Sequence, residues 1–116
     1  MRDRHAWGRT VLAVRQRDGW ACVRCGVRGG VQFSVHHRRP RGAGGSRDPH
    51  TDCPCNLLTL CMADHGWVES RRADALAQGW LVRQGQSPSM VPVATRDGTL
   101  YLDCDGGMSA EIGATA

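Results

Sequence analysis

The sequence contains no lysine, so arginine provides all 15 of its basic side chains. Against 11 acidic side chains, they give a formal net charge of +4 at pH 7. This charge is compatible with a polyanionic partner but supports one only weakly, because many basic proteins bind no nucleic acid. The use of arginine alone fits the coding bias of a GC-rich genome, and guanidinium groups also suit bidentate contacts with phosphate.

Aromatic side chains are scarce too, with four Trp, one Tyr and one Phe among 116 residues, whereas glycine occurs 15 times. A chain of this length forms one small domain with a modest hydrophobic core. A core so poor in aromatic side chains gains from a bound structural metal. The composition therefore favours a small domain that is stabilised by a metal.

The N-terminus lacks the features of a signal peptide, because no apolar segment follows the polar residues 1–5. No hydrophobic run reaches the length of a membrane span. These absences predict a cytoplasmic protein without a membrane partner. In a reducing cytoplasm, cysteines favour metal binding or redox chemistry over disulfides. The six cysteines are Cys22, Cys25, Cys53, Cys55, Cys61 and Cys104.

Local patterns predict an α+β fold. Residues 10–17 can form a short helix that starts at a threonine cap and ends at Asp-Gly. Residues 31–35 alternate apolar and polar side chains, which predicts a strand, and residues 57–60 form a second apolar run. A helix fits residues 63–78, and an Asp-Gly turn predicts a β-hairpin over 91–103. We expect a flexible N-terminus over 1–8, a main domain over 9–80, a hairpin extension over 81–105 and a disordered tail over 106–116.

A long polar loop over residues 38–55 separates the two predicted strands. A loop of this length in so small a domain is usually functional or disordered. Its arginines are candidates for DNA binding, because guanidinium forks match the oxygens of phosphate groups. A merely solvated loop is the alternative. The candidate residues are Arg38, Arg39, Arg41 and Arg47.

Three histidines and one asparagine lie close to the boundaries of the two predicted strands and of the helix that follows them. His36 and His37 follow the first strand, Asn56 precedes the second, and His65 lies in the helix after it. Neutral imidazole is a metal ligand, and it also titrates near neutral pH. A metal ion and a nearby base are what phosphodiester hydrolysis needs.

In their order and spacing, these motifs resemble the HNH endonucleases, which share a ββα-metal fold, and in particular actinobacterial and actinophage members. The resemblance covers roughly residues 9–72 and rests on residues 35–42, 56–61 and 64–68. It implies a metal-dependent DNA endonuclease that nicks or cuts double strands, leaving 3′-hydroxyl and 5′-phosphate ends. Small phage relatives often work beside the packaging terminase. DNA, and a phage terminase in a bacterial host, are thus the partners that the resemblance implies.

Site roles follow from the same resemblance, position by position. His36 and His65 would hold a catalytic divalent ion such as Mg, Mn or Ni, and His37 would be the general base. Asn56 occupies the middle position of the motif, where relatives use it to tie the loop, to orient the base or to contact the metal. Relatives often carry a further histidine where this chain has Glu69, which shares a helix face with His65.

Cys22, Cys25 and Cys61 offer three thiolates for a structural zinc ion. The fourth ligand is open between Asp64, which is in register with the second Cys of related knuckles, and Cys53 or Cys55 from the loop. A redox dithiol is a rival for the Cys-x-x-Cys pair, but the surrounding βαβ pattern of such proteins is missing.

Two further interpretations stay open for the whole chain. One is a non-catalytic, zinc-stapled module that binds nucleic acid, and the other is an adaptor that docks on a terminase. His5, His50 and Cys104 belong to no motif, so we expect the two histidines at the surface and Cys104 as an incidental or buried thiol.

Overall fold

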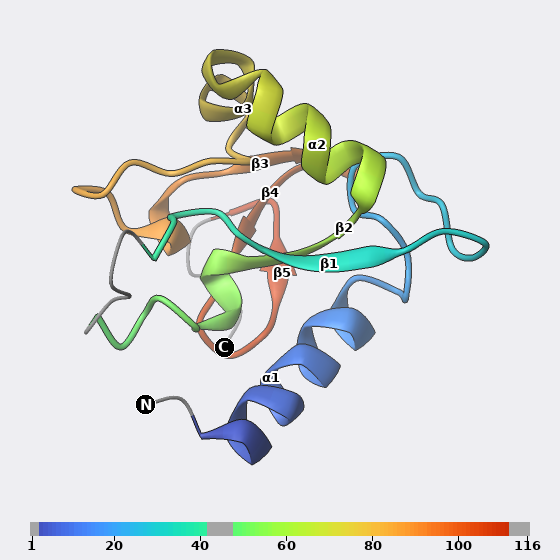
Figure 1. The fold of residues 1–116 in the computed structure, drawn as a ribbon. Coiled ribbons are helices and arrows are strands. Elements are labelled where there is room, and N and C mark those ends of the chain that lie inside the picture. Colours follow the sequence, from blue (N-terminus) through green and yellow to red (C-terminus); the bar gives the residue numbers. More distant parts are fainter. Residues whose placement is uncertain (1–2, 42–47, 112–116) are drawn as a thin grey trace.

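A two-stranded antiparallel hairpin lies at the centre of the molecule, between helices on its two sides (Figure 1). The computed structural model describes residues 3–41 and 48–111. Strand β1, Phe33–His37, pairs with β2, Leu57–Cys61, in a register that joins His37 to Leu57. All five residues of β2 are buried because helices contact it from two sides, which explains its continuous apolar run.

Helix α1, Arg4–Arg17, is longer than the sequence pattern predicts. Its cap is Asp3, whose carboxylate accepts hydrogen bonds from the backbone N–H groups of His5 and Ala6. Thr10, the expected cap, lies within the helix and donates to the carbonyl of Ala6. The prediction of a flexible N-terminus is therefore wrong for residues 4–8.

The single helix predicted over residues 63–78 is in fact two helices. Helix α2, Met62–Ser70, ends at Arg71, whose backbone is not helical (φ −122°, ψ 56°), and α3, Arg72–Gln78, follows. No glycine or proline marks this break, so the sequence pattern did not reveal it. The turn after the break directs buried Ala75 of α3 into the hydrophobic core.

Gly79 ends α3 in the left-handed conformation, with φ +83°. A Cβ atom at this position would lie 1.9 Å from the carbonyl oxygen of Pro92. Only glycine satisfies both the backbone angle and this close approach. The turn that it permits leads to Trp80, which is fully buried in the core.

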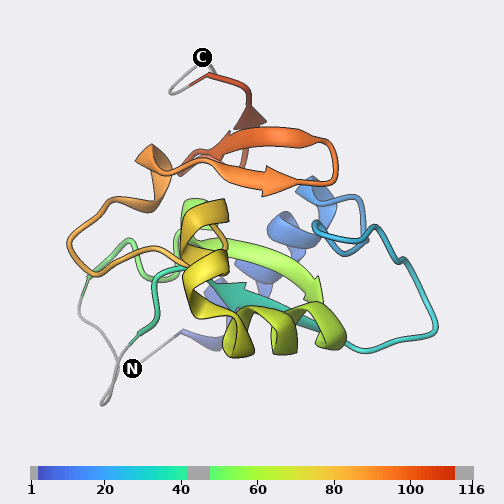
Figure 2. The same cartoon turned by 90° about the horizontal axis from the view of Figure 1, so that it is seen from above.

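A second sheet packs beside the hairpin and lies at the top of Figure 2, in orange and red. Its strands β3, Val93–Thr95, β4, Gly98–Leu102, and β5, Met108–Ser109, are antiparallel in the order β3-β4-β5. The predicted hairpin around residues 96–98 is confirmed. The prediction of a disordered tail is wrong for β5, which pairs with β4.

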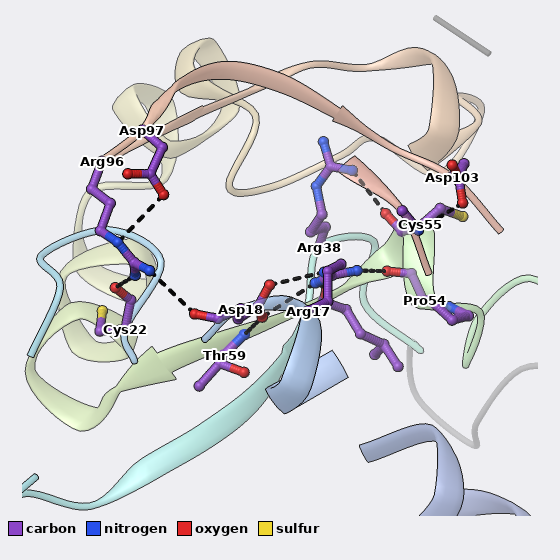
Figure 3. A network of polar contacts seen from close by, with 12 residues as sticks. Arg17, Asp18, Cys22, Arg38, Pro54, Cys55, Thr59, Arg96, Asp97 and Asp103 are labelled. Atoms are coloured by element: carbon purple, nitrogen blue, oxygen red, sulfur yellow. Dashed lines mark hydrogen bonds and ion pairs between the residues drawn. The ribbon is translucent and has the colours of Figure 1, made fainter. Parts of the chain in front are cut away.

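Polar contacts of two arginines join these layers (Figure 3). Arg17, at the end of α1, donates to the carbonyls of Pro54 (2.8 Å) and Leu57 (2.6 Å) and forms an ion pair with Asp18. The Asp18 carboxylate accepts in turn from the backbone N–H of Thr59 in β2, at 2.9 Å. These contacts hold α1 against the hairpin.

Arg96, in the β3–β4 turn, connects the second sheet to the segment between α1 and β1. Its guanidinium donates to the carbonyls of Cys22 and Asp18, and its backbone N–H donates to the carbonyl of Val23 at 3.0 Å. Helices and antiparallel sheets thus form one small α+β unit around a shared core. Among the described residues, no helix combines the length and the apolar character that a membrane crossing requires.

Candidate functional site

The end of β1 and one face of α2 bring three potential metal ligands together. One ligand atom from each of His36, His65 and Glu69 lies within 4.8 Å of the other two. The His36 and His65 rings meet edge to face, with their centroids 5.5 Å apart. Glu69 follows His65 by one helical turn, and its Oε1 lies 3.9 Å from His65 Nε2. The three predicted or noted residues of this cluster therefore do converge.

His36 is buried and held in one tautomer. Its Nε2 lies 2.7 Å from the carbonyl oxygen of Trp80, which can only accept, so Nε2 carries the proton and Nδ1 keeps its lone pair. The pKa of His36 is lowered to about 4, chiefly by burial and further by charges on His65 and His37, against the opposing effect of the Trp80 carbonyl. A neutral imidazole whose other nitrogen is fixed by a carbonyl is the usual state of a metal-binding histidine.

His37 makes a separate set of contacts. Its Nε2 lies 2.8 Å from Oδ1 of Asp52, and its ring stacks on Trp7 of α1 with centroids 5.8 Å apart and planes 7° from parallel. Because the Asp52 carboxylate accepts, Nε2 of His37 donates and Nδ1 is the basic nitrogen. Neither partner is predictable from the sequence motifs: Asp52 belongs to none of them, and Trp7 lies in the segment expected to be flexible.

The two adjacent histidines point to different sides of β1. Consecutive side chains of a strand alternate between its two faces, and here His36 meets His65 of α2 while His37 meets Trp7 of α1. The structure therefore does not bring His37 into the group of three ligands. The two imidazoles remain within electrostatic reach, since His37 contributes to the lowered pKa of His36.

Asn56 ties the long loop to the start of β2. It is fully buried; its Oδ1 accepts from the backbone N–H of Arg39 at 2.7 Å, and its Nδ2 donates to the carbonyls of Arg39 (3.0 Å) and Thr51 (2.8 Å). Both amide hydrogens are thus in use within the protein. Of the three roles considered for Asn56, these contacts match the tying of the loop, and Asn56 is a positioning residue.

Arg38 is a structural residue, and the prediction that it contacts DNA is wrong. It is fully buried, and its guanidinium donates to four carbonyl oxygens at 2.6–2.9 Å. Burial lowers its pKa to about 10, which leaves it charged at neutral pH. Four of its five N–H groups are used in this way, and its burial keeps the side chain from a phosphate group in solution. The carbonyls are those of Cys55, Gly79, Pro88 and Val91.

The other candidate arginines differ in their surroundings. Arg39 is only 8% exposed, donates to the carbonyl of Gln86 and forms an ion pair with Asp48. Its side chain is therefore engaged within the protein, against the expectation of a phosphate contact. Arg41 is exposed, so its DNA contact stays a prediction, and Arg47 lies outside the residues that the structure describes.

A second cluster contains the predicted structural-zinc ligands. One ligand atom from each of Cys22, Cys25, Cys61 and Asp64 lies within 4.8 Å of the others. A tetrahedral zinc ion with Zn–S bonds of about 2.3 Å separates two sulfur atoms by about 3.8 Å. The sulfurs of Cys25 and Cys61 lie 3.8 Å apart, and Asp64 Oδ2 lies 3.1 Å from the sulfur of Cys22. This cluster can hold a metal such as zinc, with Asp64 as the fourth group.

The surroundings of the cluster fit a cation. Burial raises the pKa of Asp64, but hydrogen bonds from neighbouring thiols and from Arg24 outweigh it and hold the carboxyl below its usual pKa. Arg24 donates to Asp64 Oδ1 at 2.6 Å and lies over the ring of Trp67, 3.7 Å from its centroid. The pKa of Cys25 is raised to about 12: the backbone N–H of Val27 lowers it, and burial and neighbouring acidic groups more than compensate. A bound cation would reverse that effect and favour the thiolates.

Cys53 and Cys55 do not belong to this cluster. Both lie instead beside Cys104, whose sulfur is 3.7 Å from that of Cys55. Of the alternatives left open for the fourth group, the structure therefore brings Asp64, and neither Cys53 nor Cys55, to the three thiols. Cys104 is exposed, so it is not the buried thiol that was one of the two expectations for it, and it lies among other potential metal ligands.

Comparisons with protein-family models, with curated proteins and with solved structures find no match for the chain. The resemblance to the HNH endonucleases therefore stands on the quoted motifs alone.

Proposed function

We propose that this protein is a metal-dependent DNA endonuclease of the HNH type. The observation that carries the proposal is the convergence of His36, His65 and Glu69 where a β-hairpin leads directly into a helix. Two imidazoles and one carboxylate leave coordination positions for water and for a phosphate oxygen. Such a mixed set of nitrogen and oxygen ligands suits Mn²⁺ or Ni²⁺, and water-rich coordination would also admit Mg²⁺.

The protonation states of the proposed ligands, and not only their positions, suit a divalent cation. His36 offers Nδ1 while its Nε2 is fixed by Trp80, and the acidic Glu69 offsets part of the charge of the ion. When bound, the ion would stabilise negative charge on the phosphate and on the leaving 3′ oxygen. These residues would hold the ion at the end of β1.

His37 acts as the general base in this proposal. Its Nδ1 takes a proton from water, the water oxygen forms a bond to phosphorus, and the bond between phosphorus and the 3′ oxygen breaks. Asp52 accepts from Nε2 of His37 at 2.8 Å, so it fixes the tautomer and stabilises the imidazolium that forms. The 3′ oxygen gains a proton, which gives 3′-hydroxyl and 5′-phosphate ends.

A second candidate function is a binding module that holds nucleic acid without hydrolysing it. It is favoured by the position of His37, which contacts Trp7 on the side of β1 away from His65. In the nuclease, the phosphate must lie across the end of β1, where both imidazoles can reach it. In the binding module, His37 would only support the loop through Asp52.

Cleavage of supercoiled plasmid by the purified full-length chain distinguishes the two functions. Reactions contain Mg²⁺, Mn²⁺ or Ni²⁺, and reactions without an added divalent ion are the control that leaves the cysteine clusters intact. The nuclease predicts metal-dependent conversion to open-circular DNA, lost in His65→Ala and in His37→Ala. His5→Ala removes an exposed imidazole on α1 and is the matched control that should keep activity. Folded protein that binds DNA but cleaves with none of these ions would overturn the proposal in favour of the binding module.

A further inference from the structure

A third group of potential metal ligands lies near the end of the long loop, whereas His36 lies before its start. It contains His50, Cys53 and Cys55 from the loop and Cys104 from the turn between β4 and β5. We infer that these four residues form a second structural zinc site, distinct from the Cys22 cluster. The inference does not depend on the proposed nuclease activity.

The distances between the ligand atoms suit a tetrahedral ion. Those of His50, Cys53 and Cys104 lie within 4.8 Å of one another, and Cys104 Sγ lies 4.0 Å from His50 Nδ1. The Cys55 and Cys104 sulfurs are 3.7 Å apart, close to the separation of about 3.8 Å that two zinc-bound sulfurs require. The Cys25 and Cys61 sulfurs of the predicted knuckle show nearly the same separation, 3.8 Å.

The loop that carries three of the ligands is shaped by its own backbone. The N–H of Cys53 donates to the carbonyl of His50 (3.2 Å), and the N–H of Asn56 donates to that of Cys53 (2.8 Å). Pro54 then begins a short 3-10 helix, Pro54–Asn56, which turns the chain between the two cysteines. The segment is therefore folded independently of any contact between the ligand side chains.

The turn that carries Cys104 is also held by backbone contacts. Asp103 Oδ1 accepts from the N–H groups of Asp105 and Gly107, each at 2.9 Å, and the N–H of Asp103 donates to the carbonyl of Gly107. Figure 3 shows Asp103, the residue before Cys104, on the segment that faces Cys55. Two loops, 49 residues apart between Cys55 and Cys104, thus lie against each other: the ligand atoms of His50 and Cys53 lie within 4.8 Å of Cys104, and Cys55 joins them through its contact with Cys104.

The chemistry of the group favours zinc. Three sulfurs and one imidazole form a donor set that is typical of structural zinc sites. Cysteine binds metal as the thiolate, so zinc binding here would release the thiol protons. His50 and Cys104 are exposed, which gives an ion access.

A zinc ion here would act on the neighbouring residues of the loop. Asp52, which bonds to His37, and Thr51, whose carbonyl accepts from Asn56, lie between the ligands His50 and Cys53. The ion would connect this part of the loop to the second sheet. It would therefore hold Asp52 in position next to His37.

Zinc content of the full-length protein, purified under reducing conditions, tests the inference. We expect about two zinc ions per chain by elemental analysis, one for each cluster of four ligands. Cys104→Ser should lose one ion, and Cys25→Ser should lose the other. Asp105→Asn changes an exposed neighbour of Cys104 in the same turn and should keep both. One ion in the parent protein, lost in Cys25→Ser but kept in Cys104→Ser, would overturn the inference.

A second measurement covers the case in which Cys104→Ser fails to fold. Cobalt titration of the parent protein, followed by the thiolate-to-cobalt absorption, should saturate at two equivalents. Cys104→His, which exchanges one zinc ligand for another, should also bind two. Saturation at one equivalent would contradict the second site, as would an intact mass in which Cys104 is joined to Cys53 or Cys55 by a disulfide.

Discussion

His37 and Asp52 are 15 residues apart in sequence, yet Nε2 of the histidine lies 2.8 Å from Oδ1 of the carboxylate. This hydrogen bond connects the end of β1 to the loop before β2. Because the carboxylate accepts, it leaves Nδ1 of His37 as the basic nitrogen. The pair therefore offers a direct test of the proposed general base.

Asp52→Asn should lower the rate of DNA cleavage on the order of 10²-fold, because the amide no longer stabilises the imidazolium form of His37. DNA affinity should change little, since Asp52 bears no positive charge. Single-turnover nicking of a plasmid, together with a binding titration, measures both effects. Asp105→Asn makes the same chemical change at an exposed position and should leave the rate unaltered. An undiminished rate in Asp52→Asn would refute the role of this carboxylate.

Arg38→Met should reduce the free energy of unfolding by roughly 3–5 kcal/mol, because it leaves buried carbonyl oxygens without donors. Urea denaturation monitored by circular dichroism measures this loss. Arg41→Met is the matched control: Arg41 is exposed, so its replacement should leave stability within about 0.5 kcal/mol of the parent. If Arg38→Met were as stable as Arg41→Met, the four carbonyl contacts would not contribute to the fold.

Gly79→Ala should destabilise the protein by more than about 2 kcal/mol, since the backbone is left-handed there and the new methyl group would overlap the Pro92 carbonyl. Gly85→Ala is the control, because no atom outside its chain neighbours lies within 4 Å of the added Cβ. Thermal unfolding of the two variants provides the comparison. Equal melting temperatures would argue against the close approach of α3 to Pro92.

Acid should weaken the fold through His36. In the folded chain, burial lowers the pKa of His36 from 6.5 to about 4, so the unfolded chain binds more protons between these two values. Stability should therefore fall as the pH drops below about 6.5, with a loss of roughly 2–3 kcal/mol between pH 7 and pH 4.5 from this group.

Urea denaturation at both pH values, without added divalent ions, measures this contribution. His36→Gln keeps a donor for the Trp80 carbonyl but does not titrate, so its stability should depend less on pH than that of the parent. His5→Ala removes an exposed imidazole and should retain the full dependence. The same loss of stability in His36→Gln as in the parent would exclude His36 as its source.

The local elements of this fold follow from short stretches of sequence. The alternation before His36, the apolar run of β2 and the Asp-Gly turn of the second hairpin each predict a strand that the structure contains. The position of Asp64, three residues after Cys61, also identified it as a candidate for the fourth group of the Cys22 cluster. In these cases, the pattern and the structure involve the same few neighbouring residues.

The remaining features depend on contacts between distant segments. Trp7 reaches His37 only because α1 extends to Arg4, and Cys104 meets Cys55 only because β4 returns beside the long loop. Neither contact between distant residues produces a periodic pattern in the sequence from which it could be predicted. An arginine in a polar loop likewise predicts exposure, whereas Arg38 is buried and donates to four carbonyls from three separate segments.

At some buried positions, lysine could not replace arginine without loss of hydrogen bonds. The planar guanidinium groups of Arg17 and Arg38 each donate hydrogen bonds to several carbonyl oxygens. A single ammonium group on a flexible stem cannot reach those acceptors in the same fixed directions. Replacement of the exposed Arg41 or Arg72 by lysine should therefore leave the fold intact. The same replacement at Arg17 or Arg38 should remove hydrogen bonds that join distant segments and destabilise the fold.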